Sequence, residues 1–260
     1  MDAIARFATL VAQRDPTPVA LDEGALCIAA ALRPPVDEPA VLEALDALAR
    51  TCQEATFDGV RDAIFTRAAF AGNRLNYADP ENSLLDAVMR RRLGIPITLA
   101  LVMIEVGRRI DVAISPVGMP GHFLVRDDAT GRFCDPFAGG ILLDAEGCRD
   151  RYTALFGSRR PFHPSLLERS TSRSVLARVL ANLEQTALAN DRRRLEIMLE
   201  LHRSIPDLVA TDRLAIAARY EAIGYYADAA RQVDGAVAIL PEPQAATARA
   251  KAISLRARTN

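Results

Sequence analysis

The chain has 260 residues, half of them apolar, which is enough to bury a substantial core and to divide into two domains. Its formal net charge is −1, so no general electrostatic attraction directs it toward nucleic acid or an anionic membrane. No apolar run could span a bilayer, the charged N-terminus is unlike a secretory signal, and the four scattered cysteines lack zinc-site spacing; we expect a cytoplasmic protein without metal or cofactor.

The first 70 residues are predicted to form amphipathic helices. Apolar residues recur at helical spacing over 3–13, 25–33 and 40–51, and proline-rich stretches separate these segments. Cys27 and Cys52 are expected to pack inside these helices, because a free cysteine behaves as a small buried hydrophobic residue.

A loop rich in asparagine follows and can be interpreted in two ways. Asn73, Tyr77 and Asn82 lie between the first helices and a helix expected over 84–92. Such residues satisfy backbone groups in turns and caps, and Asn82 or Ser83 could cap the helix that follows. Alternatively, the three residues form a binding loop beside a functional site. The helix ends in three arginines, which we expect to be a solvated helix end.

The next helix is predicted to begin at Pro96 and to be buried. Proline suits the first helical position, where its missing N–H costs nothing, and the residues from 97 to 104 are apolar on nearly every side. The N-terminus of a buried helix stabilises a developing anion such as a thiolate. Proline, however, has no ionisable group.

A strand is predicted after this helix over 112–118, and two more follow over 121–126 and 132–135. If Arg126 and Gly131 close the hairpin loop between them, His122 lies directly opposite Asp135 with both side chains on one face. Cys134 then points to the other face, because adjacent strand residues alternate. The pair could be a general base held by a carboxylate, or a structural histidine with a buried partner.

The motifs FAGNRLNYADPENSLLDAVMRRRLGIPITLALVMIEVGRR, PGHFLV and DPFAGG occur in this order over residues 65–150. Together they closely resemble the SirB-type bacterial family, named invasion regulators, within the transglutaminase-like superfamily. The resemblance implies a papain-like fold in which His122 and Asp135 occupy the histidine and aspartate positions. It also implies that Pro96 stands in the position of the catalytic cysteine, so the usual nucleophile is missing.

Thr98 is the one substitute nucleophile close to that position. Its hydroxyl lies in the first turn of the same helix, but two residues from Pro96, or about 200° around the helix axis. A threonine there more often binds backbone groups or packs. Cys148 is expected to be an ordinary helix residue.

The chain after residue 165 is predicted to be entirely helical. His202 lies in an apolar helix pattern and is expected to pack. One segment has the spacing of a tetratricopeptide unit. The residues at that spacing are Ala217, Tyr220, Gly224, Tyr226, Ala229, Ala236 and Pro241. The resembled family also carries such a tail.

We therefore predict an α+β protein with a transglutaminase-like domain over 1–165, in which N-terminal helices precede a buried helix packed on a small antiparallel sheet. A tetratricopeptide-like helical domain follows over 166–260. The predicted function is non-catalytic binding or regulation of a protein or peptide, with the candidate residues His122, Asp135, Asn73, Tyr77, Asn82 and Thr98. The alternative is a hydrolase or amidase in which the His122 and Asp135 pair activates water or Thr98.

Overall fold

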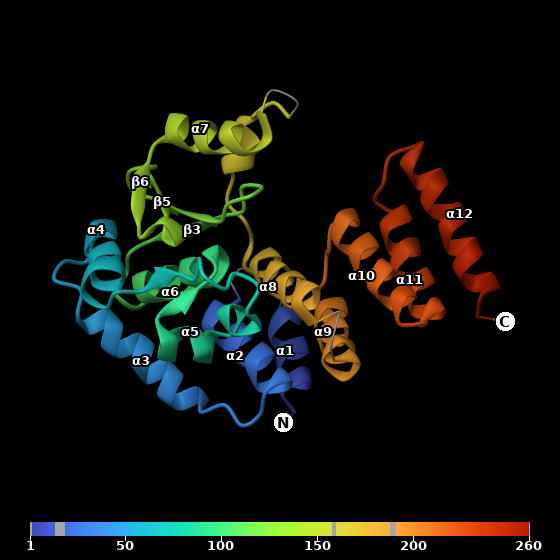
Figure 1. The fold of residues 1–260 in the computed structure, drawn as a ribbon, viewed down its shortest axis with the longest axis horizontal. Coiled ribbons are helices and arrows are strands. Elements are labelled where there is room, and N and C mark those ends of the chain that lie inside the picture. Colours follow the sequence, from blue (N-terminus) through green and yellow to red (C-terminus); the bar gives the residue numbers. More distant parts are fainter. Residues whose placement is uncertain (1, 14–18, 158–159, 188–190, 260) are drawn as a thin grey trace.

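The computed structural model describes residues 2–13, 19–157, 160–187 and 191–259. The predicted N-terminal helices are present as α1 (Ala3–Ala12), α2 (Leu21–Leu32) and α3 (Glu38–Arg50). The side chain of Asp37 caps α3 by accepting a hydrogen bond from the backbone N–H of Ala40 at 3.1 Å. These helices form the base of the molecule, and α3 runs along its outer edge (Figure 1).

Short elements connect α3 to the buried helix. They are α4 (Phe57–Arg61), the π-helix η1 (Asp62–Arg67), β1 (Ala71–Gly72), the 3₁₀-helix η2 (Pro80–Ser83), α5 (Leu85–Arg91) and β2 (Leu93–Gly94). Strands β1 and β2 pair in parallel, which brings the two ends of the loop over 73–92 together. The prediction that Asn82 or Ser83 caps α5 was wrong, because α5 begins after Leu84 without a side-chain cap and both residues lie inside η2.

The buried helix is α6 (Pro96–Arg109), and it begins at Pro96 as predicted. It also carries a buried carboxylate, that of Glu105. Asp22 of α2 provides a second carboxylate beside it, and both residues are almost fully buried. Arg109 donates to the carboxylates of Asp22 at 2.7 Å and Glu105 at 3.0 Å. Burial and the neighbouring charge of Asp22 raise the pKa of Glu105. This ion-pair network joins α2 to α6.

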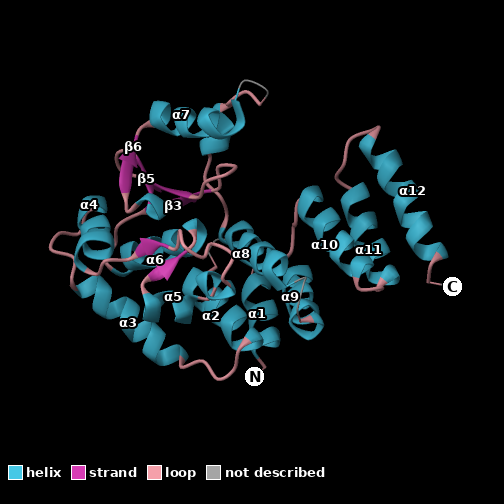
Figure 2. Ribbon diagram, in the orientation of Figure 1, coloured by secondary structure: helices cyan, strands magenta, loops and turns pink. Residues whose placement is uncertain are grey.

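A four-stranded antiparallel sheet follows, in the order β3-β4-β5-β6. Its elements are β3 (Ile114–Val117), β4 (Leu124–Asp127), β5 (Phe133–Asp135), the 3₁₀-helix η3 (Pro136–Ala138) and β6 (Ile141–Leu143). Helix α7 (Ala145–Phe156) lies across the sheet on the side away from α6 (Figures 1 and 2). The predicted small sheet packed on a buried helix is therefore present.

The two faces of the sheet bury different residues, as strand alternation predicts. Phe123 and Cys134 belong to the main core around α6. Leu124 and Phe133 belong to a smaller cluster under α7, which also contains Cys148. Cys134 thus points away from the face that carries Asp135, because successive strand residues face opposite sides.

The rest of the chain is helical, as expected. It comprises the 3₁₀-helix η5 (Pro164–Leu167), α8 (Ser172–Ala187), α9 (Arg192–Ser204), α10 (Ala210–Ala222), α11 (Tyr226–Val237) and α12 (Gln244–Ala257). Helices α8 and α9 pack against α1 and α2. Helices α10, α11 and α12 form a separate layer that projects from one end of the molecule (Figure 1).

A buried charged group joins α8, α9 and α10. Glu184 is fully buried and His202 almost so, with His202 Nδ1 2.7 Å from Glu184 Oε1. Arg219 Nε lies 2.8 Å from Glu184 Oε2. His202 is therefore a packing residue, as predicted. The sequence analysis did not anticipate that it packs with Glu184 and Arg219.

Candidate functional site

His122 and Asp135 lie together at one end of the sheet, although not in the predicted register. Val125 pairs with Cys134 and Arg126 with Phe133, so one further step along the strands puts Leu124, and not His122, opposite Asp135. The predicted register was wrong by two residues. The hairpin loop is instead closed by a hydrogen bond from the N–H of Asp127 to the carbonyl of Arg132 at 2.9 Å.

His122 and Asp135 still lie on the same side of the sheet after this change in register. A shift of two residues preserves the side to which a residue in an extended segment points. His122 Nδ1 lies 3.6 Å from Asp135 Oδ2, which is beyond a normal hydrogen bond. The imidazole lies in the turn just before β4, with 25% of its side chain exposed, whereas only 3% of the Asp135 side chain is exposed.

Asp135 has stronger partners than His122. Its Oδ1 atom accepts hydrogen bonds from the backbone N–H groups of Phe137 and Ala138, both at 3.1 Å. Its Oδ2 atom accepts a hydrogen bond from Arg151 of α7 at 2.9 Å. Burial opposes ionisation, but His122, the backbone donors and Arg151 together hold the pKa of Asp135 below its usual value. Arg151 was not anticipated, and an arginine within a helix gives no sequence signal for this contact.

The position of His122 depends on a tight turn against α7. Gly121 has a φ of +78°, which favours glycine, and it lies against the exposed side chain of Leu155. The neighbouring Phe123 ring supports the guanidinium of Arg178 from α8, with 5.2 Å between the arginine Cζ and the ring centroid. Thus α7 and α8 both border the imidazole's turn.

The N-terminus of α6 is closed by the chain's own backbone. The buried Thr98 hydroxyl donates to the carbonyl of Asn82 at 2.6 Å and accepts from the N–H of Ile95 at 3.2 Å. Its oxygen therefore serves the helix cap. This is the backbone-bonding role weighed for Thr98 from the sequence, and a buried hydroxyl offers no surface to a ligand.

Asn73 and Asn82 hold the loop over 73–82 from within. The Asn73 side chain donates to the Asn82 side chain at 3.0 Å, and both residues are buried. Asn82 Nδ2 also donates to the carbonyl of Asn76 at 2.8 Å. These two candidates stabilise the loop and do not offer side chains to solvent.

Tyr77 is the candidate on this loop that faces outward. More than half of its surface is exposed, and its ring meets the Phe137 ring edge-on at a centroid distance of 5.6 Å. The partial burial of Tyr77 raises the pKa of its phenol above the usual value, and the nearby positive charge of Arg178 opposes this rise. Phe137 follows Asp135 by two residues. The contact between the Tyr77 and Phe137 rings therefore connects the loop over 73–82 to the pair of His122 and Asp135.

Neither Cys134 nor Cys148 presents an exposed thiol to His122. Cys134 and Cys148 are fully buried, and burial raises the pKa of each to about 12. Cys148 lies on the side of the sheet that carries Asp135, where the charges of Asp144 and Asp135 raise its pKa further. Burial also raises the pKa of Cys27 and Cys52. A raised pKa suppresses the thiolate that acts as the nucleophile.

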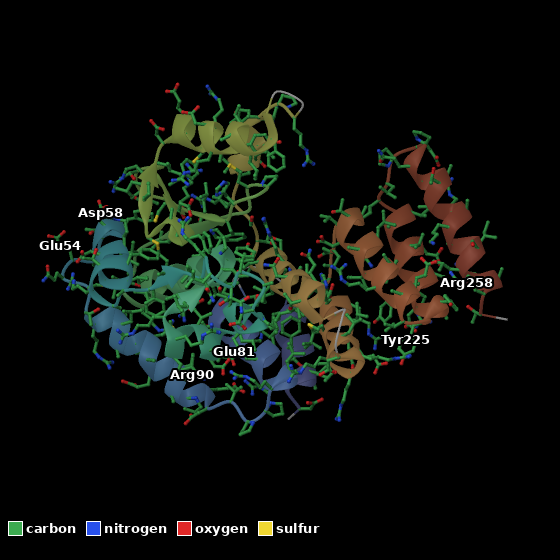
Figure 3. The ribbon with its side chains drawn as sticks, viewed as in Figure 1. Glu54, Asp58, Glu81, Arg90, Tyr225 and Arg258 are labelled. Carbon is green, nitrogen blue, oxygen red and sulfur yellow. The ribbon has the colours of Figure 1, made fainter. Side chains whose placement is uncertain are left out.

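The three arginines at the end of α5 differ from one another. Arg91 pairs with Asp79 at 2.7 Å and with Glu81 at 3.0 Å. Arg90 is 3.8 Å from Glu81, and both side chains are labelled in Figure 3. The interpretation as a simple solvated helix end was therefore incomplete, since two of the three charges are partnered.

The described ranges contain neither a candidate metal cluster nor a candidate membrane-spanning helix. Within residues 2–13, 19–157, 160–187 and 191–259, no group of three His, Cys, Asp or Glu side chains is arranged to hold a metal ion. In the same ranges, no helix combines the length and apolar character needed to cross a bilayer.

Comparison with known proteins assigns the family. Residues 28–181 match the model of the transglutaminase-like superfamily, and the chain belongs to this superfamily. It is 42% identical to a UPF0162 protein of Xylella fastidiosa strain Temecula1 over 135 residues, which are 50% of this chain and 48% of that protein. It is 32% identical to a UPF0162 protein of Pseudomonas aeruginosa over 178 residues, 65% of each chain.

A shorter match links the chain to a eukaryotic protein. F-box only protein 21 of mouse is 35% identical over 97 residues, which are 36% of this chain and 15% of that protein. The chain thus spans about half to two thirds of the length of the bacterial relatives named above, and a small part of the mouse protein. No solved structure matches it.

Proposed function

We propose that this member of the transglutaminase-like superfamily is a non-catalytic module, of the SirB type, that binds a protein or peptide on the face formed by the loop over 73–82 and the turn before β4. The observation that carries the proposal is Pro96 at the start of α6, where the resembled catalysts have their cysteine. A pyrrolidine ring has no proton to give and no electron pair with which to attack a carbonyl carbon.

Two features argue against a substitute nucleophile in the same region. The Thr98 hydroxyl is buried and bonded to backbone groups. The carboxylate of Asp135 is engaged by Arg151 and two backbone N–H groups, so it is poorly placed to orient the imidazole of His122. A general base needs its orienting partner within hydrogen-bond reach.

The loop has properties that suit a protein interface. Asn73 and Asn82 stiffen it from within, and Leu75 and Tyr77 project from it, Leu75 being fully exposed. Rigid loops that present aromatic and apolar side chains lose little conformational entropy on binding. We call Leu75 and Tyr77 the loop pair.

The charges beside the loop pair favour an acidic partner. Arg178 stacks on Phe123, and Arg74 lies over the Phe137 ring with 5.4 Å between Cζ and the ring centroid. Within the described ranges neither guanidinium has a carboxylate within 4 Å. Cations without carboxylate partners near exposed apolar side chains suit an acidic segment that also carries an apolar residue.

The helices after residue 165 fit an interaction tail. Helices α10 and α11 pack side by side, with Ala217, Ala229 and Ala236 at most 4% exposed. This is the close helix approach that the tetratricopeptide pattern requires. As part of the same proposal, the tail is a tetratricopeptide-like unit, and the protein works in the cytoplasm, where its four free cysteines stay reduced.

Site-specific photo-crosslinking tests this binding face. A benzophenone amino acid replaces Leu75 in one variant and Ile253, an exposed apolar residue of α12, in another. We expect a discrete crosslinked partner in host cells from position 75, and its loss when Tyr77→Ala is added. Crosslinks from position 253 alone would instead assign recognition to the tail.

A catalytic assay tests the other half of the proposal. Purified protein is incubated with amide and ester substrates and with amine acceptors. We expect no turnover above that of a matched His122→Ala variant. Turnover that disappears in the variant would establish the alternative function, a hydrolase or amidase that uses this imidazole.

A further inference from the structure

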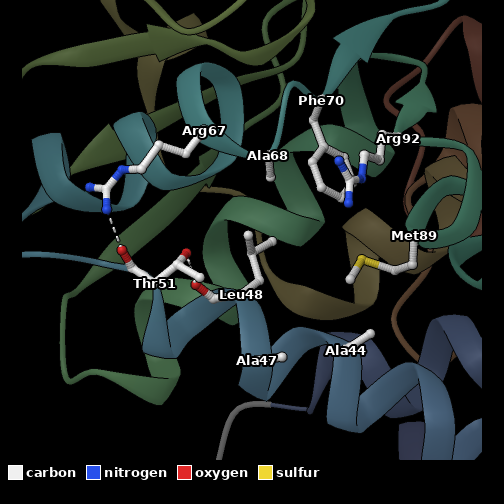
Figure 4. Close-up of a pocket in the computed structure, with 9 residues that line it drawn as sticks. All are labelled: Ala44, Ala47, Leu48, Thr51, Arg67, Ala68, Phe70, Met89 and Arg92. Carbon is white, nitrogen blue, oxygen red and sulfur yellow. Dashed lines mark hydrogen bonds between the residues drawn. The ribbon is translucent and has the colours of Figure 1, made fainter.

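A cavity lies between α3, the end of η1 and α5. Its volume is about 460 Å³, within the range of small-molecule sites, and its lining includes none of the residues discussed above around His122 (Figure 4). Helix α3 supplies one wall and Phe70 and Met89 supply the opposite side. This cavity therefore needs an explanation separate from the proposed binding face.

Most of the residues that line the cavity are apolar. The cavity is open because the residues along one wall are small, and larger side chains close its bottom. Ala44 and Ala47 are exposed on α3, and their methyl groups leave the groove open. Leu48 and Phe70, with 8% and 4% of their surfaces exposed, close its bottom. A hydrocarbon chain laid in this groove would contact carbon atoms on both sides.

The polar groups at the two ends of the cavity differ in their state. Arg67, at one end, is neutralised: its Nε atom donates to Asp62 at 2.8 Å and its Nη1 atom donates to the carbonyl of Thr51 at 2.6 Å. Arg92, at the other end, has no carboxylate within 4 Å among the residues that the structure describes. Among the described residues, Arg92 is thus an exposed cation at the cavity that lacks a carboxylate partner.

The backbone places that charge at the cavity. Arg92 has a φ of +56°, a left-handed conformation that residues with a Cβ atom adopt rarely. This conformation ends α5, and the Arg92 side chain is among those that line the cavity (Figure 4). Ala69, next to the lining residue Ala68, shares this uncommon conformation with a φ of +55°. Such conformations concentrate at ligand sites.

We propose that this cavity binds a small amphipathic monocarboxylate, whose carboxylate group pairs with Arg92 while its hydrocarbon chain lies between Ala47 and Met89. A monocarboxylate matches the charge of Arg92, and a hydrocarbon chain matches the apolar walls. Inorganic phosphate would leave the apolar walls unused, and a neutral lipid would leave the guanidinium unpaired.

Titration with decanoate, followed by two-dimensional ¹H–¹⁵N NMR, tests the proposal on the full chain. We expect saturable shifts at the amides of Ala44, Ala47 and Ala68. Arg92→Gln is expected to weaken binding at least tenfold, since it removes a charge-assisted pair. Arg90→Gln is the matched control, because it removes a neighbouring charge that is already partnered, and it should leave the affinity unchanged.

Further arms separate the proposal from its rivals. Ala47→Leu adds bulk at an exposed helix position and is expected to abolish the shifts while the protein stays folded. Equal decanoate affinity in the wild type and Arg92→Gln would overturn the proposal. So would decanol binding as tightly as decanoate, or phosphate saturating the same amides at the same concentration.

Discussion

The thiols of this protein are expected to be unreactive, and Cys148 provides the sharpest test because it lies on the same side of the sheet as Asp135. Its pKa is raised from 9.0 to about 12. A rise of three units lowers the thiolate fraction at pH 8 roughly a thousandfold, since each unit changes it tenfold. Complete burial slows the reaction further.

The assay is alkylation of the native protein with iodoacetamide at pH 8, followed by mass spectrometry of each cysteine peptide. The chain unfolded in urea is the internal reference. We expect Cys134 and Cys148 to react at least a thousandfold more slowly in the native protein than in the reference. Cys52, which is the only cysteine with partial exposure, should react first.

One outcome would refute this reasoning. If Cys148 reacts in the native protein as fast as in the unfolded chain, and His122→Ala slows that reaction, the imidazole activates a thiol. The proposal of a non-catalytic module would then fail, because the missing cysteine at the start of α6 would have a replacement from α7.

Three further predictions concern stability. Glu184→Ala should lower the free energy of unfolding in urea by about 3–5 kcal/mol, because it leaves a buried arginine and a buried histidine without their partner; a loss below about 1 kcal/mol would contradict the buried ion pair. Asn82→Ala should cost about 2–3 kcal/mol and raise amide hydrogen exchange over 73–79, with α12 as the unaffected control. Because the pKa of Asp135 is lowered by folding, its ionised form stabilises the protein above pH 3.8, and this stabilisation is lost as the pH falls through the folded pKa. Arg151→Gln should therefore weaken the acid dependence of the unfolding free energy measured between pH 5 and 2, and an unchanged dependence would show that the other partners hold the carboxylate alone.

Local sequence patterns predicted the elements that surround the site. The start of α6 at Pro96 followed from the preference of proline for the first helical position, and its burial from the run of apolar residues. The opposite directions of Cys134 and Phe133 followed from strand alternation. These features depend on neighbouring residues in the chain, so one sequence was enough.

The hairpin register could not be predicted correctly from the sequence, because the side chain of Asp127 determines where the turn begins. Asp127 accepts a hydrogen bond from the N–H of Ala129 at 3.1 Å and so builds the turn itself. The strand therefore extends through Asp127, and the pairing moves by two residues. A turn's closing pair depends on such contacts, which residue types alone do not specify.

The sequence by itself determined the family, the buried helix with proline at its start, and the presence of a histidine and an aspartate on neighbouring segments. Only the tertiary structure decided that Arg151 shares the carboxylate of Asp135 and that Arg92 lines a cavity without a carboxylate partner among the described residues. Both outcomes arise when side chains from distant elements compete for the same few acceptors. Distances between separate helices and strands govern that competition, and no local pattern records them.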